Sequence, residues 1–215
     1  GQMTAGLQYQ ARVASYREER ARVLYEFARD MSSLLLTEDV GAAATKIIAN
    51  TFRAKVAILV PDARDRLASP AGAAQGPAID LGAAQWAYDK AQPAGAGTDT
   101  LAGNENLYLP LRAPMRTRGV LVIRPDHARI LLVPEQRRLL DTFAALTAIA
   151  LERVHYVEIA QQALIHMESE RLRNSLLSAL SHDLRTPLAA LVGLAESLTM
   201  TKPALSGAQH ETAQA

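Results

Sequence analysis

Apolar residues recur along this chain with two different periods, which divide it into helical and extended segments. Residues 4–36 carry a helical period, with no proline and no glycine after Gly6. Heptad spacing of apolar side chains is typical of a helix that pairs with another helix. That spacing is followed by Tyr9, Val13, Tyr16, Val23, Phe27 and Leu34. A second helix is predicted from Thr37, an expected N-cap, because Glu38 and Asp39 suit a first turn.

Short runs of β-branched and aliphatic residues follow the second helix. Such runs, bounded by turn residues, are typical of strands. Strands are predicted at 55–60, 107–112 and 119–124, a short one near Leu67, and an edge segment at 130–133. Residues 83–90 predict a short helix that contains Trp86 and Tyr88, both expected in the core. Residues 92–101 predict a flexible loop.

A last helical pattern begins at Pro134, a favoured first residue of a helix, and reaches about Met200. Leu146, Ile149 and Ala150 are expected against the sheet or against a partner chain. Two apolar sets with heptad spacing follow: Val157, Ala160, Leu164 and Met167, then Leu177, Leu180, Leu184, Leu191, Leu194 and Leu198. They are out of phase, and such a discontinuity changes the winding of a coiled coil locally. The break is either a polar linker surface or a switching joint.

The order of these elements predicts an α+β fold. Two helices, strands, a short helix, strands and a helix occur in that order in a GAF domain, a central antiparallel sheet with helices on one side and a ligand cleft on the other. The GAF domain is expected between long N- and C-terminal helices that form coiled coils. Residues that could border the cleft are Trp86, Gly95, Gly97 and Thr98, although the loop lacks the full glycine pattern of a phosphate-binding loop.

The most distinctive motif lies within the last helix, at residues 181–188 (SHDLRTPL). The heptad places His182 far from the leucine seam, where another domain can reach the imidazole. A carboxylate bonded to one ring nitrogen fixes the tautomer and makes the other nitrogen a better nucleophile, a role that suits Asp183. Pro187 has no N–H, so the carbonyl of Asp183 loses its helical partner and the helix can kink there.

This motif resembles the phosphoacceptor box of sensor histidine kinases. The wider run at 176–199 resembles the KdpD type, the potassium-responsive sensor kinases, as do the segments WAYDK, PAGAGTDTL and VPEQRRLLDTF. Similarity covers residues 1 to about 199. The resemblance implies that His182 is phosphorylated from ATP with Mg²⁺ and that Asp183 orients it. It also implies that Thr186 places a water molecule for phosphatase activity and that Arg185 assists docking. The phosphoryl group then passes to an aspartate of a KdpE-like response regulator.

The resemblance also implies a domain organisation. Residues 1–36 form a juxtamembrane helix, 37–150 the GAF sensor, 151–175 a signalling helix, 176–200 the first helix of the dimerisation domain, and 201–215 a turn and tail. A parallel homodimer is expected, in the cytoplasmic portion of a bacterial inner-membrane protein whose membrane spans lie upstream. The ATP-binding domain is absent from this sequence, so the chain alone is expected to bind no ATP and to be inactive as a kinase.

Two other classes of protein stay open. One is a non-catalytic phosphotransfer or scaffold protein with a GAF domain. The other is a GAF-type transcription regulator, which needs a helix-turn-helix where residues 4–36 predict one unbroken helix. Basic residues near the N-terminus either form a solvated helix face paired with Glu18, Glu19 and Glu26 or contact anionic lipid headgroups: Arg12, Arg17, Arg20 and Arg22.

Composition and charge narrow the chemistry further. A net charge of +1 gives no reason to expect nucleic acid as a partner. With no cysteine, the chain forms no disulfide and no thiolate metal site, which suits a reducing cytosol. The other histidines, His127, His155, His166 and His210, show no metal-ligand spacing, so no metal site is predicted. The longest apolar run, 143–151, is too short to cross a bilayer.

Overall fold

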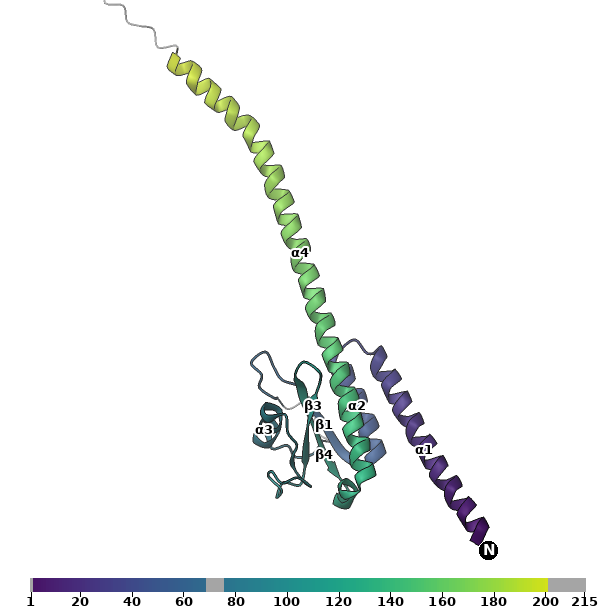
Figure 1. Cartoon of the computed structure of the whole chain (residues 1–215). Helices are drawn as coiled ribbons and strands as arrows, with labels where there is room; N and C mark the ends of the chain where they lie inside the picture. The colour runs from purple at the N-terminus through teal and green to yellow at the C-terminus, as the bar shows by residue number, and fades with distance from the viewer. Residues whose placement is uncertain (1, 69–75, 201–215) are drawn as a thin grey trace, which may run out of the picture. The chain divides into compact units, whose positions relative to one another are not determined.

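The structure is a computed structural model, and it describes residues 2–68 and 76–200 (Figure 1). The predicted tail at 201–215 lies outside the described residues, as do the side chains of Tyr9, Arg12, Val13 and Tyr16. The chain divides into two compact units between Ile159 and Ala160. The elements in order are α1 (Gln2–Ser33), α2 (Thr37–Phe52), β1 (Ala54–Leu59), α3 (Leu81–Lys90), β2 (Ala94–Gly95), β3 (Leu107–Arg112), β4 (Thr117–Pro125), the 3-10 helix η2 (Ala128–Leu132) and α4 (Pro134–Met200).

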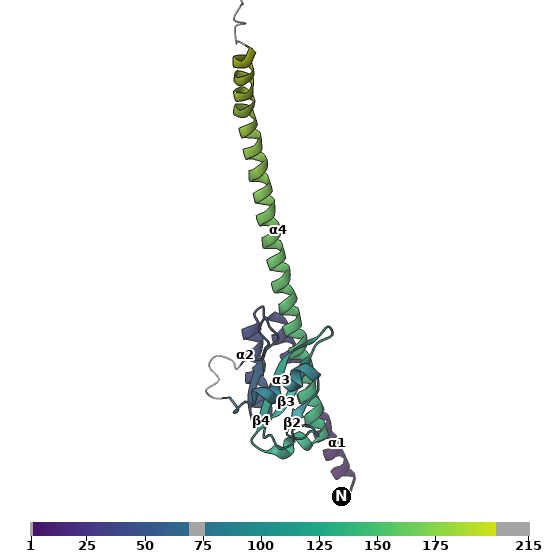
Figure 2. The same cartoon turned by 90° about the vertical axis from the view of Figure 1, so that its left-hand side faces the viewer.

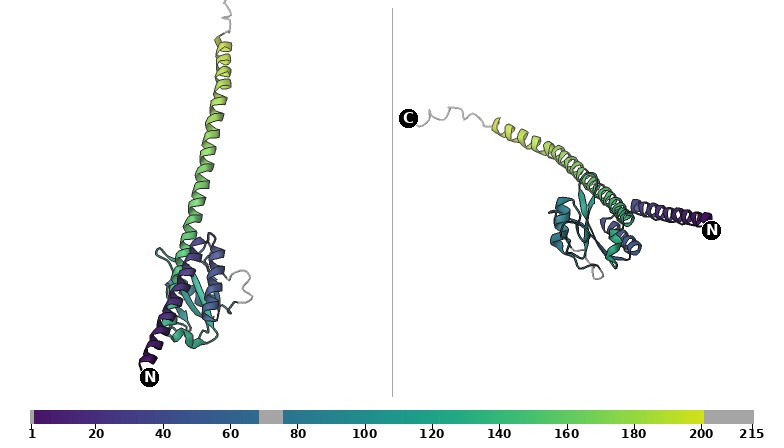
Figure 3. Two further views of the ribbon diagram at one scale, coloured as in Figure 1. Left: turned by 90° about the vertical axis from the view of Figure 1, so that its right-hand side faces the viewer. Right: turned by 60° about the horizontal axis from the view of Figure 1, so that its bottom comes forward.

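The centre of the first unit is a four-stranded antiparallel sheet with strand order β1-β4-β3-β2. Helix α2 and the first part of α4 cover one face of this sheet, and α3 covers the other (Figures 1 and 3). Figure 2 looks onto the face that carries α3. The predicted α+β fold is confirmed, and the three main predicted strands agree with β1, β3 and β4 to within two residues.

Side chains alternate across the sheet and fill two apolar clusters, one on each face. The larger cluster joins α1, α2 and α4 to one face through residues such as Val56 and Ile123, which are register partners. The smaller cluster packs α3 on the other face and includes Tyr88, with Trp86 at its margin. Both aromatic residues were expected in the core: this is confirmed for Tyr88, whereas Trp86 is only partly buried. The face opposite α2 is therefore packed rather than open.

Four local predictions differ from the structure. The predicted short strand near Leu67 is only an isolated bridge between Pro61 and Leu67, and the predicted loop at 92–101 contains the two-residue strand β2. Helix α2 has Leu36 rather than Thr37 at its N-cap, because the Leu36 carbonyl already accepts the first helical hydrogen bond, from Val40 N–H at 3.1 Å. Residues 130–133 do not form an edge strand. Their backbone closes short turns instead, with Ile130 N–H donating to the His127 carbonyl at 3.0 Å, and so the segment is the end of η2.

The C-terminal end of the predicted α1 seam packs inside its own chain. Phe27 is 1% exposed, and its ring meets that of Phe143 edge to face with centroids 4.7 Å apart. Val23 and Leu34 pack against the same cluster. The prediction that these three residues pair with another helix of a coiled coil is therefore corrected: they are part of the core that joins α1 to α2 and α4.

Candidate functional site

The phosphoacceptor motif lies on an exposed stretch of α4. The side chain of His182 is 81% exposed and that of Asp183 80%, and His182 Nδ1 lies 3.3 Å from Asp183 Oδ1. In the neutral tautomer that this contact favours, Nδ1 carries the hydrogen and Nε2 keeps its lone pair. The exposed imidazole therefore leaves Nε2 accessible to another domain.

The surroundings of His182 are equally exposed. Arg185 and Thr186 are exposed, and Ser181, Leu184 and Leu188 line a shallow groove that continues along the helix. The helix runs through Pro187 to Met200 without ending. The leucines of the second predicted seam are more than half exposed in the single chain: Leu177, Leu180, Leu184, Leu191 and Leu194. A row of exposed leucines on one helix marks an interaction surface.

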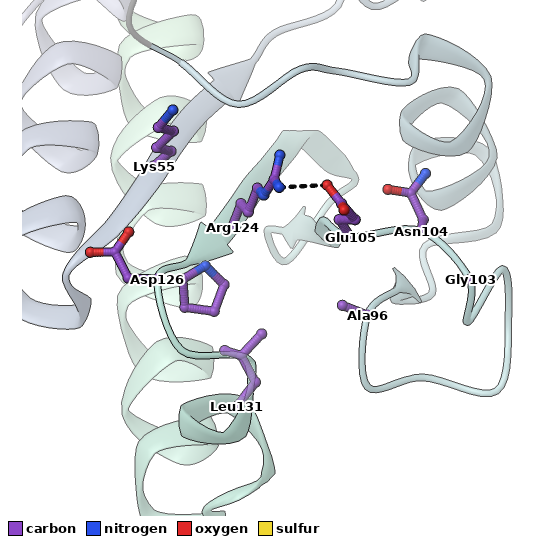
Figure 4. Close-up of a pocket in the computed structure, with 9 residues that line it drawn as sticks. Lys55, Ala96, Gly103, Asn104, Glu105, Arg124, Asp126 and Leu131 are labelled. Carbon is purple, nitrogen blue, oxygen red and sulfur yellow. Dashed lines mark ion pairs between the residues drawn. The ribbon is translucent and has the colours of Figure 1, made fainter.

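A cavity of about 590 Å³ lies at the end of the sheet where β1 begins and β4 ends (Figure 4). Lys55 and Arg124 are register partners on the neighbouring strands β1 and β4, and both side chains line the cavity. Arg124 forms an ion pair with Glu105 at 2.6 Å. Asp126 gives a second acidic group, so the formal charges of the lining cancel. The lining is completed by Ala96, Gly103, Asn104, Pro125 and Leu131.

None of the four residues predicted at a GAF cleft belongs to the lining of this cavity, although Gly95 and Gly97 flank Ala96, which does. Trp86 packs against the smaller apolar cluster. Gly95 is buried in β2 with φ +91°, and a Cβ there would lie 2.0 Å from the Asn106 carbonyl oxygen, so the backbone requires glycine. The Thr98 hydroxyl lies 2.8 Å from both the Gly95 and the Thr100 carbonyl oxygens and shares its single hydrogen between them, which closes the loop on itself. Gly97 has φ +72° in open space.

Sequence reasoning missed a polar cluster of Asp65, Tyr88 and Arg116. The Arg116 guanidinium donates to Asp65 Oδ1 and, at 2.7 Å, to the Tyr88 hydroxyl, which itself donates to Asp65 at 3.1 Å. The hydrogen bonds from Arg116 and then Tyr88 lower the pKa of Asp65 below its ordinary value. Burial raises the pKa of Tyr88. No spacing in the sequence indicates this cluster, because 51 residues separate Asp65 from Arg116.

This cluster predicts a small loss of stability in acid. The pKa of Asp65 is lowered in the folded chain. Its ionised side chain therefore adds to the free energy of unfolding above the unfolded pKa of 3.8, and this stabilisation is lost as the pH falls through the folded pKa. The urea concentration at the unfolding midpoint should therefore fall less between pH 7 and pH 3 in Asp65→Asn than in the parent. Asp99→Asn, at an exposed loop position, is the control and should behave as the parent does. Equal falls in all three proteins would contradict the assignment.

The fold and the motif define the class of protein. The GAF domain model matches residues 37–153, more than half of the chain, so the chain belongs to the GAF domain family. The His Kinase A (phospho-acceptor) domain model matches residues 172–215, which include His182. A GAF domain is thus followed by a phosphoacceptor-type helix.

Individual relatives narrow this class to one type of sensor protein. Sensor protein KdpD of Escherichia coli (strain K12) is 47% identical over 201 residues, which are 93% of this chain and 22% of that protein. Sensor protein KdpD of Clostridium acetobutylicum is 28% identical over 92% of this chain and 23% of its own length. The solved GAF domain of the potassium sensor histidine kinase KdpD from Escherichia coli has a TM-score of 0.60 at 40% identity, covering 66% of this chain and 99% of that one.

The resemblance to KdpD-type sensor kinases is therefore confirmed, and the chain spans less than a quarter of the length of these relatives. Within residues 2–68 and 76–200, no helix has the length and hydropathy needed to span a membrane. The same residues contain no group of three side chains that could hold a metal ion.

Proposed function

We propose that this chain is the sensor and phosphoacceptor portion of a sensor histidine kinase, and that His182 is the residue that carries the phosphoryl group. The observation that supports this most directly is the exposed His182 imidazole with Asp183 against Nδ1, within the part of the chain that matches the phosphoacceptor family. The proposed boundaries are those of the sequence prediction: helix 1–36, GAF domain 37–150, signalling helix 151–175, phosphoacceptor helix 176–200 and tail 201–215.

In the proposed reaction, Nε2 of His182 attacks the γ-phosphorus of ATP. The new P–N bond forms as the bond between the γ-phosphorus and the β,γ-bridging oxygen breaks, and ADP leaves opposite the attacking nitrogen. The proton on Nδ1 stays in its contact with Asp183, whose negative charge stabilises the positive charge that develops on the ring. ATP and Mg²⁺ are brought by a catalytic domain of the whole protein. An aspartate of a KdpE-like response regulator then accepts the phosphoryl group.

Two neighbours of His182 have proposed roles of their own. Thr186 lies four residues after His182, on the same face of the helix, and its hydroxyl is proposed to hold the water that removes the phosphoryl group. Arg185 offers an exposed guanidinium for the catalytic domain or for the phosphoryl oxygens. Thr186 would act only after the phosphoryl group has reached His182, whereas Arg185 could already act when the catalytic domain docks.

The whole protein is proposed to act as a parallel homodimer on the cytoplasmic side of a bacterial inner membrane. The exposed leucines from Leu177 to Leu194 support the pairing, because two copies of such a helix bury their leucines against each other. Potassium is proposed as the stimulus, because the solved relative is described as a potassium sensor. A small ligand that touches the Gly95–Thr100 loop and Trp86 remains a proposal for the GAF domain.

A transfer experiment tests the proposal. The chain should gain no label when it is incubated with γ-labelled ATP alone. It should gain an acid-labile label when full-length KdpD of Escherichia coli is added, with the acceptor histidine of that protein replaced by glutamine. Label that appears with ATP alone would contradict the expected lack of kinase activity. A chain that takes label from neither mixture would favour the scaffold alternative.

A further inference from the structure

The C-terminus of α1 is held by a residue from another part of the chain. A helix leaves its last carbonyl groups without helical partners, and α1 has no basic side chain in its last turn. Ser32 and Ser33 hydroxyls bond the Arg29 and Asp30 carbonyls at 2.6 and 2.8 Å. The carbonyls that follow need a donor from elsewhere.

Arg153 of α4 is that donor. Its Nη1 donates to the Ser32 carbonyl at 2.8 Å, and its Nη2 donates to the Met31 and Leu34 carbonyls at 2.9 and 2.5 Å. A guanidinium can hold several carbonyls at once because its donors point outward in a fixed plane, and its positive charge also suits the negative end of the helix dipole. One side chain of α4 therefore supplies the cap that α1 lacks.

The residue before Arg153 contacts the other side of the unit. Glu152 Oε1 accepts from the Met115 N–H at 3.2 Å and from Arg118 at 3.4 Å, so it ties α4 to the hairpin between β3 and β4. The guanidinium of Arg118 lies 5.4 Å from the centre of the Tyr156 ring. Two consecutive residues of α4, Glu152 and Arg153, thus bind the β3–β4 hairpin and the end of α1, which are distant in sequence.

These contacts lie where α4 leaves the core of its unit. Val154 is the last residue of α4 that is buried, and from Ile159 to Ser197 every side chain is exposed except the half-buried Glu170. Besides the Phe27–Phe143 contact nearer the start of α4, residues 152–156 are therefore the place where α1 and the hairpin act on α4 just before it leaves the core.

We propose that Arg153 couples α1 directly to α4, so that a shift of α1 is passed to the outgoing helix without a ligand in the GAF cavity. The Glu152–Arg118 ion pair separately connects the β3–β4 hairpin to the same turn of α4. Arg153 is thus a positioning residue, and the coupling goes beyond the proposed function because it exists whether or not His182 accepts phosphate.

Hydrogen exchange on the whole chain tests the coupling. Arg153→Met keeps much of the apolar stem but removes all three donors, so amides of residues 27–33 should exchange about tenfold faster, as the loss of hydrogen bonds to a charged group predicts. Strand β3 should change less than twofold. In Arg153→Lys, the exchange rates of these α1 amides should lie between those of the parent and of Arg153→Met, because one ammonium group cannot reproduce the planar arrangement of guanidinium donors. Arg138→Met is the matched control: the same change on the same helix, at an exposed position, with parent-like exchange in α1.

A distance measurement tests transmission itself. Because the chain has no cysteine, spin labels can be placed at Glu26→Cys on α1 and Ile159→Cys on α4 without removing native thiols. The distance distribution should be narrow in the parent and in Arg138→Met and clearly broader in Arg153→Met. Unchanged exchange in α1, equal acceleration in α1 and β3, or an equally narrow distribution in Arg153→Met would each overturn the proposal. None of these readouts depends on phosphorylation.

Discussion

Replacing His182 by glutamine is expected to abolish acid-labile labelling of the chain in the transfer experiment, to below about 1% of the parent. Glutamine keeps a polar, uncharged side chain of similar reach, but its amide nitrogen has no lone pair available to attack phosphorus. The residue is exposed, so the substitution disturbs no core packing, and the GAF domain should unfold at the parent urea concentration. The loss can therefore be assigned to chemistry rather than to folding.

His166→Gln is the matched control, because His166 lies on an exposed part of the same helix and outside the motif. This variant should take up label as the parent does. Asp183→Asn should label roughly 100-fold more slowly, since an amide in place of the carboxylate no longer stabilises the charged ring, and loss of one group that stabilises transition-state charge typically costs about that much or more. Label that persists in His182→Gln, or is lost in His166→Gln, would refute the assignment of the phosphoacceptor.

Glu152→Leu is expected to destabilise the GAF unit by about 3–5 kcal/mol, the usual cost of removing one member of a buried ion pair. Arg118 and Glu152 have side chains only 8% and 10% exposed, so the change leaves a guanidinium in the interior without a counter-charge. One nitrogen of that group, Nε, already has no partner within the described structure, and little remains to compensate the loss. Urea unfolding can be followed by Trp86, the only tryptophan of the chain, which packs in this unit.

The double variant Arg118→Met/Glu152→Leu separates loss of the contact from burial of a lone charge. It replaces both ions by apolar groups and should recover most of the lost stability, because desolvating two charges offsets much of what their attraction contributes. A double variant as unstable as Glu152→Leu would show that the hairpin depends on the ion pair itself. Single-variant stability equal to that of the parent would mean that the pair contributes nothing.

Much of the fold could be predicted from the sequence because the spacing of apolar residues within each segment indicates whether it is a helix or a strand. The strands at β1, β3 and β4 follow from short apolar runs, and the length of α4 follows from a helical period that only Pro187 interrupts. The phosphoacceptor candidate could also be found in this way, since its residues are consecutive on one helix. Contacts between neighbours on a helix are fixed as soon as the helix forms.

Other features depended on which distant surfaces meet. Heptad spacing in α1 is the same whether Phe27 faces a second chain or its own sheet, and only the tertiary structure placed it against Phe143. The lining of the GAF cavity likewise combines the end of β4 with a separate loop, so none of the predicted cleft residues belongs to it. Local pattern specifies which side of an element is apolar, but not what covers it.

The sequence by itself determined the main helices and strands of this protein, their order and the motif around His182, because each depends on residues a few positions apart. The tertiary structure alone decided that Arg153 caps α1, that Glu152 holds the β3–β4 hairpin, and that Asp65 meets Arg116. The physical reason is that a charged side chain has no periodicity of its own. Its partner is selected by where the packing of the apolar faces leaves unpaired carbonyls and charges.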